Sequence, residues 1–100
     1  NADTIASEIA ISMSKEYDTE LIYCFDKQGV LADVNDNNSV IEQIDSKSYQ
    51  ELIANKTIHE GMLPKMENSF HALNNKVSKV IIGNAQVIND NNEVYTSLIV

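Results

Sequence analysis

The chain has 100 residues, of which 43% are hydrophobic and 22% charged, and its formal net charge at pH 7 is −8. These values are ordinary for one globular domain that can bury a core. The negative charge argues against a general nucleic-acid or anionic-membrane surface, and no apolar run approaches the ~18 residues of a membrane-spanning helix.

The cysteine content and the start of the sequence set two further expectations. Cys24 is the single cysteine and cannot form an internal disulfide, so we expect a reducing compartment, the cytoplasm. No signal-peptide pattern is present, and the sequence starts without Met, already inside a helical pattern. We therefore expect residues 1–100 to form one part of a longer polypeptide.

The first elements expected along the chain are a helix and a strand. Residues 3–16 lack Gly and Pro and carry apolar side chains at helical spacing. The face expected to point inward consists of Ile5, Ala6, Ile9, Ala10 and Met13. The run ELIYCF at 20–25 predicts a buried strand, followed by a turn at Gly29 and an Asn-rich loop.

Two more helices are expected before the second long strand. Residues 46–55 predict an amphipathic helix, with Asp45 or Ser46 as its N-terminal cap. Its inward residues would be Tyr49, Leu52 and Ile53. Residues 61–77 predict a third helix, whose start is marked by Gly61 and Pro64. Its apolar face would consist of Leu63, Met66, Phe70, Leu73 and Val77.

The chain should end with two strands. The run KVIIGN at 79–84 predicts a second buried strand, residues 88–92 a loop, and residues 93–100 a final strand. Alternation of helices with continuous apolar strands predicts an α/β fold, a three-layer sandwich around a mainly parallel sheet. In such sheets ligands bind beyond the carboxyl ends of the strands, here at the loops DKQG and GNAQ.

Most common catalytic patterns are missing from the sequence. His59 and His71 lie too far apart for a zinc pair, and no metal site is expected. Cys24 lies in an apolar strand, which favours an inert core thiol over a nucleophile. No Gly-x-Ser-x-Gly, Gly-x-x-x-x-Gly-Lys-Ser/Thr or Gly-x-Gly-x-x-Gly pattern occurs.

Charged residues near the starts of the helices stand out. Lys65 falls in the first turn of its helix, where the dipole disfavours a cation, but where a lysine and free N–H groups together suit an anion. The alternative is a solvated surface lysine. Asp3, in the first turn of its own helix, is explained by the dipole alone unless the fold brings it to Lys65. Asp26 is either a turn former or part of a ligand-facing loop.

Three segments together resemble acetylglutamate kinases of the amino acid kinase family. NADTIASEIA is similar to their Asn-Ala-Asp-x-x-Ala segment, LIYCFDKQGVL to their strand followed by Asp-x-x-Gly-Val-Leu, and GMLPKMENSFHAL to their Gly-Met-x-x-Lys helix start. The order and approximate spacing also agree. The resemblance implies the C-terminal, nucleotide-binding half of such an enzyme, with the substrate-binding half outside this chain.

The resemblance also implies roles for individual residues. Lys65 would contact the phosphates and stabilise the transferring phosphoryl group, and Asp3 would organise the catalytic lysines. Asn1 would lie beside the site of the acylated amino acid. The residues that would bind the nucleotide are Asp26, Lys27, Gln28, Gly29, Val30, Leu31, Thr57, Ile58 and His59.

The implied reaction is the ATP-dependent, Mg²⁺-assisted phosphorylation of the γ-carboxylate of N-acetyl- or N-succinyl-glutamate in arginine biosynthesis. It would require the longer protein, which we expect to be a homo-oligomer. The alternatives are a glutamate, aspartate or carbamate kinase of the same family, or a non-catalytic nucleotide- or amino-acid-binding module. The absence of Asp-Gly-Arg and Gly-x-Gly-Thr after the second long strand favours the last alternative, whereas the presence of Asp3 and Lys65 together argues against it. Two further departures concern the nucleotide contacts: Phe25 replaces Ser or Thr, and Lys27 replaces an apolar residue.

Overall fold

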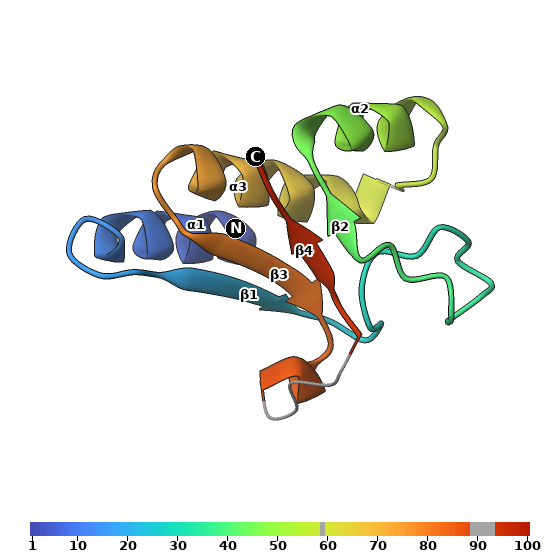
Figure 1. Cartoon of the computed structure of the whole chain (residues 1–100), viewed down its shortest axis with the longest axis horizontal. Coiled ribbons are helices and arrows are strands. Elements are labelled where there is room, and N and C mark those ends of the chain that lie inside the picture. Colours follow the sequence, from blue (N-terminus) through green and yellow to red (C-terminus); the bar gives the residue numbers. More distant parts are fainter. Residues whose placement is uncertain (59, 89–93) are drawn as a thin grey trace.

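The computed structural model describes residues 1–58, 60–88 and 94–100. Within these ranges the chain forms three α-helices, two short 3₁₀ helices and one sheet, whose arrangement is drawn in Figure 1. In chain order the elements are α1 (Ala2–Met13), β1 (Glu20–Cys24), β2 (Gln43–Ile44), α2 (Ser46–Ala54), η1 (Glu60–Met62), α3 (Leu63–Asn74), β3 (Lys79–Gly83), η2 (Ala85–Ile88) and β4 (Thr96–Leu98).

The strands form one mixed sheet in the order β1-β3-β4-β2. β1 pairs with β3 in parallel, from Glu20 opposite Lys79 to Cys24 opposite Gly83. β4 runs antiparallel to β3 and parallel to β2. The predicted α/β class is therefore confirmed. Two of the three strand pairings are parallel, and the third, between β3 and β4, is antiparallel.

Helices α1 and α3 lie side by side over β1 and β3 (Figure 1). Both helices run opposite to these strands, so the helix N-termini and the strand carboxyl ends share one end of the molecule. The core between them contains fully buried side chains from three elements: Met66 of α3, Val80 and Ile82 of β3, and Leu98 of β4. All members of the apolar face predicted for the third helix belong to this core or pack against it. The predicted helix at 61–77 is too long, because α3 ends at Asn74 and Val77 is buried in the segment that follows it.

The inward face predicted for α1 is wrong in part. Ile5, Ile9 and Met13 are 61%, 56% and 49% exposed and form an outer stripe along the helix. Ala6 and Ala10 of the predicted face do pack inward. They are joined by Ser7 and Ile11, which the prediction did not include. The reason is the close approach of α3, which leaves room for small side chains, and Ser7 Oγ donates a hydrogen bond of 3.2 Å to Asn68 Oδ1 across this contact.

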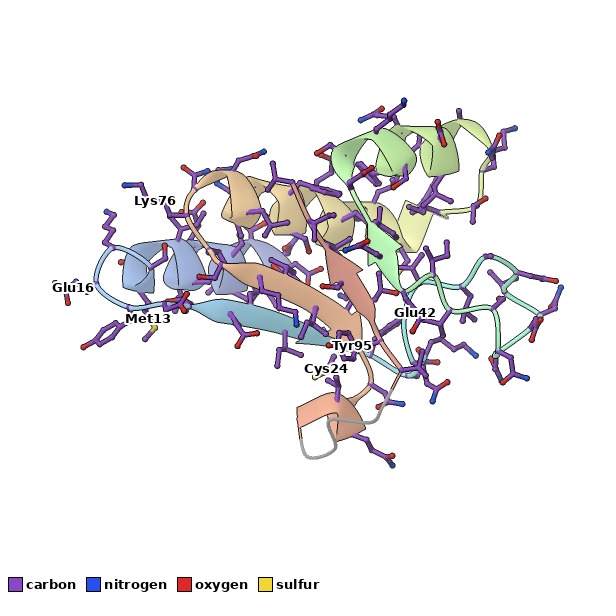
Figure 2. All side chains as sticks on the ribbon, viewed as in Figure 1. Met13, Glu16, Cys24, Glu42, Lys76 and Tyr95 are labelled. Atoms are coloured by element: carbon purple, nitrogen blue, oxygen red, sulfur yellow. The ribbon has the colours of Figure 1, made fainter. Side chains whose placement is uncertain are left out.

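β1 is a half-buried strand at the edge of this sheet, whereas the sequence predicted a buried strand. Tyr23 is buried and Leu21 packs against the core, whereas Ile22 is partly exposed on the opposite face. Cys24 is exposed as well, at the carboxyl end of β1, so the prediction of a core thiol is wrong (Figure 2). An edge strand with only one covered face alternates between buried and exposed side chains, and apolar composition alone does not reveal this.

The loop before α2 contains structure that the composition did not predict. β2 is two residues long, and an isolated bridge joins Leu31 to Val40. Asp45, one of the two predicted caps, accepts a 2.7 Å hydrogen bond from Ser48 N and forms a capping box with that residue. Most of the loop predicted at 88–92 lies outside the described residues. Within the described ranges no helix is long and apolar enough to cross a membrane.

Candidate functional site

Lys65 and Asp3 meet between α1 and α3. Lys65 Nζ donates hydrogen bonds to Asp3 Oδ1 at 3.1 Å and to Oδ2 at 3.3 Å. Each residue lies in the first turn of its helix, and the two helices start at the same end of the molecule. The side chains are 20% and 25% exposed, so the pair is partly screened by solvent but open to a ligand. The fold thus fulfils the condition under which Asp3 can hold the Lys65 ammonium.

Tyr23 lies against this ion pair from the sheet side. The Lys65 ammonium sits 5.6 Å from the centroid of the Tyr23 ring. The Tyr23 hydroxyl donates a 2.6 Å hydrogen bond to the backbone carbonyl of Asp3. Burial and the Asp3 charge raise the pKa of Tyr23 to about 12, against the smaller opposing effect of a hydrogen bond with Ser7. The phenol therefore stays neutral at physiological pH and remains a hydrogen-bond donor.

The N-terminus of α3 has the features of an anion site. No side chain caps it, and Pro64 occupies its first turn. The first N–H groups of a helix lack partners within the helix and carry a partial positive charge, to which Lys65 adds a full charge. Backbone N–H groups and an ammonium at one helix start can together bind a phosphate.

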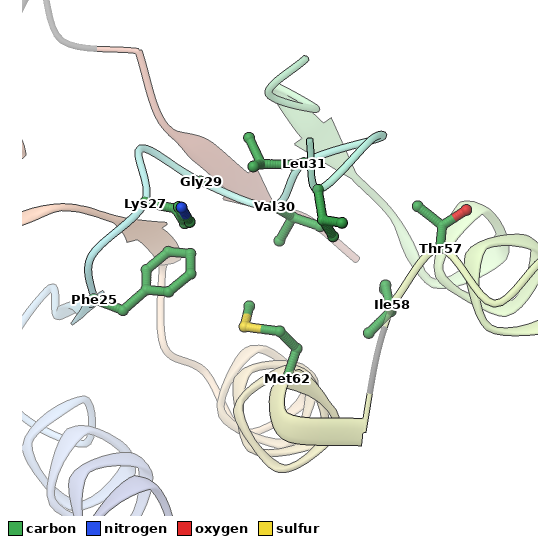
Figure 3. Close-up of a pocket in the computed structure, with 9 residues that line it drawn as sticks. Phe25, Lys27, Gly29, Val30, Leu31, Thr57, Ile58 and Met62 are labelled. Atoms are coloured by element: carbon green, nitrogen blue, oxygen red, sulfur yellow. The ribbon is translucent and has the colours of Figure 1, made fainter. Parts of the chain in front are cut away.

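A pocket lies next to this helix start, beyond the carboxyl end of β1. Phe25, Val30, Ile58 and Met62 point into it from different sides (Figure 3). Met62 comes directly before α3, three positions ahead of Lys65. The complete lining consists of Phe25, Lys27, Gly29, Val30, Leu31, Val34, Thr57, Ile58 and Met62. Its mostly apolar walls suit a flat, uncharged group such as a nucleobase, while Lys27 supplies one cation at the rim.

The loop that forms one wall is anchored by Thr96 of β4. The Thr96 hydroxyl accepts a hydrogen bond from Val30 N at 2.8 Å and donates one to the carbonyl of Ile41 at 2.7 Å. A Cβ at Gly29 would lie 2.5 Å from this hydroxyl, so only glycine fits here without displacing a neighbour. A buried contact between residues 66 positions apart therefore holds the loop against the sheet.

The residues predicted to bind the nucleotide do not all line this pocket. Lys27, Gly29, Val30, Leu31, Thr57 and Ile58 line the pocket described above. Asp26 and Gln28 instead line a neighbouring pocket, to which Lys27, Leu31 and Asn37 also contribute. His59 lies outside the described residues. The structure therefore brings the two predicted segments, around Gly29 and around Ile58, to one place.

Asn1 and His71 lie away from that pocket lining. Asn1 caps α1, with its side-chain oxygen accepting a 2.9 Å hydrogen bond from Thr4 N. His71 contacts Glu8 at 3.1 Å on an exposed part of the α1–α3 contact. Where residues 1–58, 60–88 and 94–100 are concerned, no three His, Cys, Asp or Glu side chains gather as a metal site.

Three lining residues did not appear among the predicted site residues: Phe25, Val34 and Met62. Phe25 follows β1 directly, so its position at a strand carboxyl end was a usable signal. Met62 lies in the helix start already singled out for Lys65. Val34 lies in the polar loop, and no local pattern distinguishes it, because only the folding of the loop over the pocket brings it there.

The chain matches known proteins over most of its length. The model of the amino acid kinase family matches residues 1–84. The acetylglutamate kinase of Bacteroides thetaiotaomicron is 48% identical over 91 residues, which are 91% of this chain and 35% of that protein. The acetylglutamate kinase of Cytophaga hutchinsonii is 45% identical over 103 residues, covering 99% of this chain and 39% of that protein. The chain thus spans about a third of the length of the curated relatives it matches.

Solved structures show the same fold. The protein smu.665 of Streptococcus mutans UA159 superposes with a TM-score of 0.74 at 30% identity, over 98% of this chain and 35% of that one. Giardia carbamate kinase superposes with a TM-score of 0.69 at 18% identity, over 93% of this chain and 31% of that one. At that identity the second likeness concerns the fold alone.

Proposed function

Because the chain belongs to the amino acid kinase family, we propose that it is the C-terminal, nucleotide-binding part of a longer kinase that transfers the γ-phosphoryl group of ATP to the γ-carboxylate of N-acetyl-L-glutamate. The names of relatives at 43–52% identity support this substrate. The activity belongs to the full-length polypeptide, since the chain spans about a third of these relatives. The proposal includes a cytoplasmic, homo-oligomeric enzyme of arginine biosynthesis.

The observation that carries the proposal is that the pocket residue Met62 directly precedes the helix start in which Lys65 lies. An adenine held between Phe25 and Ile58 would direct its phosphates towards the start of α3, where Met62 lines the pocket and Lys65 follows one turn later. The 3.1 Å contact with Asp3 holds the ammonium at that helix start. A base pocket next to a fixed cation is the arrangement that nucleotide binding needs.

The proposed chemistry asks mainly for positioning and neutralisation of charge. A carboxylate oxygen of the substrate attacks the γ-phosphorus, the bond between that phosphorus and the β,γ-bridging oxygen breaks, and ADP leaves with the bond's electron pair. The attacking group is already anionic, so no general base is required. Lys65 would stabilise the negative charge on the phosphoryl oxygens, and Asp3 would keep its ammonium oriented. Mg²⁺ would accompany the phosphates of ATP.

The first test measures ADP release by the full-length polypeptide with Mg-ATP. N-acetyl-glutamate, N-succinyl-glutamate and free glutamate serve as parallel substrates, with aspartate and carbamate as further arms. We expect release with N-acetyl-glutamate. ADP release with another of these substrates and not with N-acetyl-glutamate would refute the proposed substrate and identify the kinase reaction with that other substrate. ATP binding without release from any arm would support a non-catalytic binding module.

The second test concerns Lys65 itself. The change Lys65→Ala should lower turnover by about 10²–10³-fold and leave ATP binding largely intact, as expected when a donor to the transition state is lost. Lys15→Ala is the matched control, because Lys15 is an exposed lysine just beyond the C-terminal end of α1. Unchanged turnover in Lys65→Ala would refute the assignment of Lys65.

A further inference from the structure

Tyr23 has no role in the chemistry proposed above, yet it touches both members of the ion pair. It is the fourth residue of β1 and is only 5% exposed. Its side chain occupies the helix-facing side of the sheet, near the carboxyl end of the strand, in register with Ile82 of β3. A buried side chain at this point is held firmly by the core around it.

The ring of Tyr23 restrains the ammonium of Lys65. An ammonium within about 6 Å of an aromatic centroid is attracted to the negative face of the ring, and the distance here is 5.6 Å. The Asp3 carboxylate holds the same nitrogen at 3.1 Å. A flexible lysine with two separate attractive contacts has far fewer accessible positions than one with a single partner.

The hydroxyl of Tyr23 restrains the other member of the pair. It donates its 2.6 Å hydrogen bond to the main-chain carbonyl of Asp3, the residue whose carboxylate holds Lys65. The bond ties the first turn of α1 to the end of β1. One rigid side chain therefore sets the position of the carboxylate through the backbone and that of the ammonium through the ring.

We propose that Tyr23 is the positioning residue of this site, which holds Lys65 and Asp3 at the distance that phosphoryl transfer requires. This inference rests on the proposed function for its catalytic consequence. Its structural content, the restraint of the Lys65 ammonium by the Tyr23 ring, is independent of any reaction. The two parts can therefore be tested separately.

The kinetic test compares two changes in the full-length polypeptide. Tyr23→Leu removes ring and hydroxyl and should lower kcat about 3- to 30-fold, with little change in the KM for ATP. Tyr23→Phe keeps the ring and should recover most of that loss. Tyr49→Leu is the matched control, because Tyr49 is another buried tyrosine with a 2.7 Å hydrogen bond, to Glu67. It should leave kcat unchanged.

A second readout does not depend on activity. The rate at which an amine-specific reagent modifies Lys65, measured by mass spectrometry, should rise several-fold in Tyr23→Leu and stay near the wild-type rate in Tyr23→Phe. Lys79 offers an internal comparison, since its ammonium lies 5.5 Å from the Tyr95 ring. Tyr95→Leu should raise the labelling of Lys79 and not of Lys65, which separates the local effect of a ring from general loosening.

The outcomes separate the inference from the function. Faster labelling of Lys65 in Tyr23→Leu, without ADP release from the wild type, would support the positioning and refute the kinase. Equal labelling of Lys65 in wild type and Tyr23→Leu would overturn the inference whatever the activity. A kcat loss in Tyr49→Leu as large as that in Tyr23→Leu would also overturn it, since the effect would then be one of stability.

Discussion

Asp3 shows how one side chain can serve a helix and a site at once. Its place in the first turn of α1 suits the helix dipole, which alone explains an acid there. Its two contacts with Lys65 Nζ add a second role that the dipole does not explain. Because the carboxylate lies where phosphates are proposed to bind, it should orient Lys65 and at the same time repel the nucleotide slightly.

Asp3→Asn is the change that separates these effects, since the amide has the same shape and no charge. Turnover of the full-length polypeptide should fall about 10- to 100-fold, the size of a lost hydrogen bond between charged groups. The affinity for ATP should stay equal or rise. Glu8→Gln serves as control, because it alters the comparable but exposed contact between α1 and α3 through His71. A loss of ATP affinity in Asp3→Asn would contradict the assignment.

Gly29→Ala tests the close approach between the pocket loop and β4. The added Cβ would lie 2.5 Å from Thr96 Oγ1 and 2.9 Å from a Val40 methyl group. The clash should lower the free energy of unfolding by about 1–3 kcal/mol and weaken nucleotide binding, because the hydrogen bond from Val30 N to Thr96 stretches. Urea unfolding and ATP titration measure the two effects.

Gly83→Ala provides the graded comparison. Its nearest contacts would be 3.1 Å to the carbonyl of Gln28 and 3.2 Å to Tyr95 Cβ, so the neighbours need to move less. We expect a smaller loss of stability than in Gly29→Ala. The reverse order would show that the distances around Gly29 do not limit the loop.

At the level of elements, helix starts organise this fold. α1 begins at the cap Asn1, α2 at the capping box of Asp45, and α3 without a side-chain cap but with Pro64 and Lys65 in its first turn. A helix start whose N–H groups have no capping side chain can offer them to a ligand. The N-terminus of α2 is thus closed by its own capping side chain, whereas the N-terminus of α3 leaves its N–H groups available for a ligand.

The cap of α2 predicts a pH effect. Hydrogen bonds from the Ser48 backbone and hydroxyl lower the pKa of Asp45 below its ordinary 3.8 in the folded chain. The cap therefore contributes its full stability above that ordinary value, and the contribution is lost as the pH falls through the lowered pKa. Urea midpoints of wild type and Asp45→Asn, measured from pH 6 down to pH 2.5, should differ most at pH 6 and converge at the acid end, where only the wild type loses its ionised cap. Parallel curves would contradict this.

At the scale of the whole molecule, two of the exposed apolar surfaces lie on regular elements of the described part of the chain. One is the outer stripe of α1, formed by Ile5, Ile9 and Met13, and the other is the far face of β1 with Ile22 and Cys24. A run of large apolar side chains along one exposed helix face marks a contact surface. We expect other parts of the longer polypeptide to cover it, in keeping with the one third of its relatives' length that this chain spans.

The chain produced alone should therefore self-associate. Ile5→Lys combined with Ile9→Lys should shift it towards the monomer in analytical ultracentrifugation, because both side chains point outward and tolerate charge. Ile11→Lys is the contrasting change, since Ile11 packs against the core and its replacement should unfold the chain. Self-association that persists in the double variant would assign it to another surface, such as the edge of β1.

Local patterns in the sequence determined the helices, the two long strands, the α/β class and the glycine turn at the pocket. Helical spacing and continuous apolar runs report how each segment buries its own side chains, and this information lies within a few residues. The same locality made the Lys65 helix start conspicuous. The structure then placed it where the two predicted loop segments meet.

Only the tertiary structure decided which of these features meet. The Lys65–Asp3 pair joins residues 62 positions apart, and the Thr96 anchor joins residues 66 apart, distances over which sequence spacing carries no geometric information. Sequence spacing likewise did not reveal that the apolar stripe of α1 faces outward or that Cys24 is exposed. Periodicity identifies an apolar face. Whether that face is buried depends on how closely a neighbouring helix approaches and on whether one or both faces of the sheet are covered.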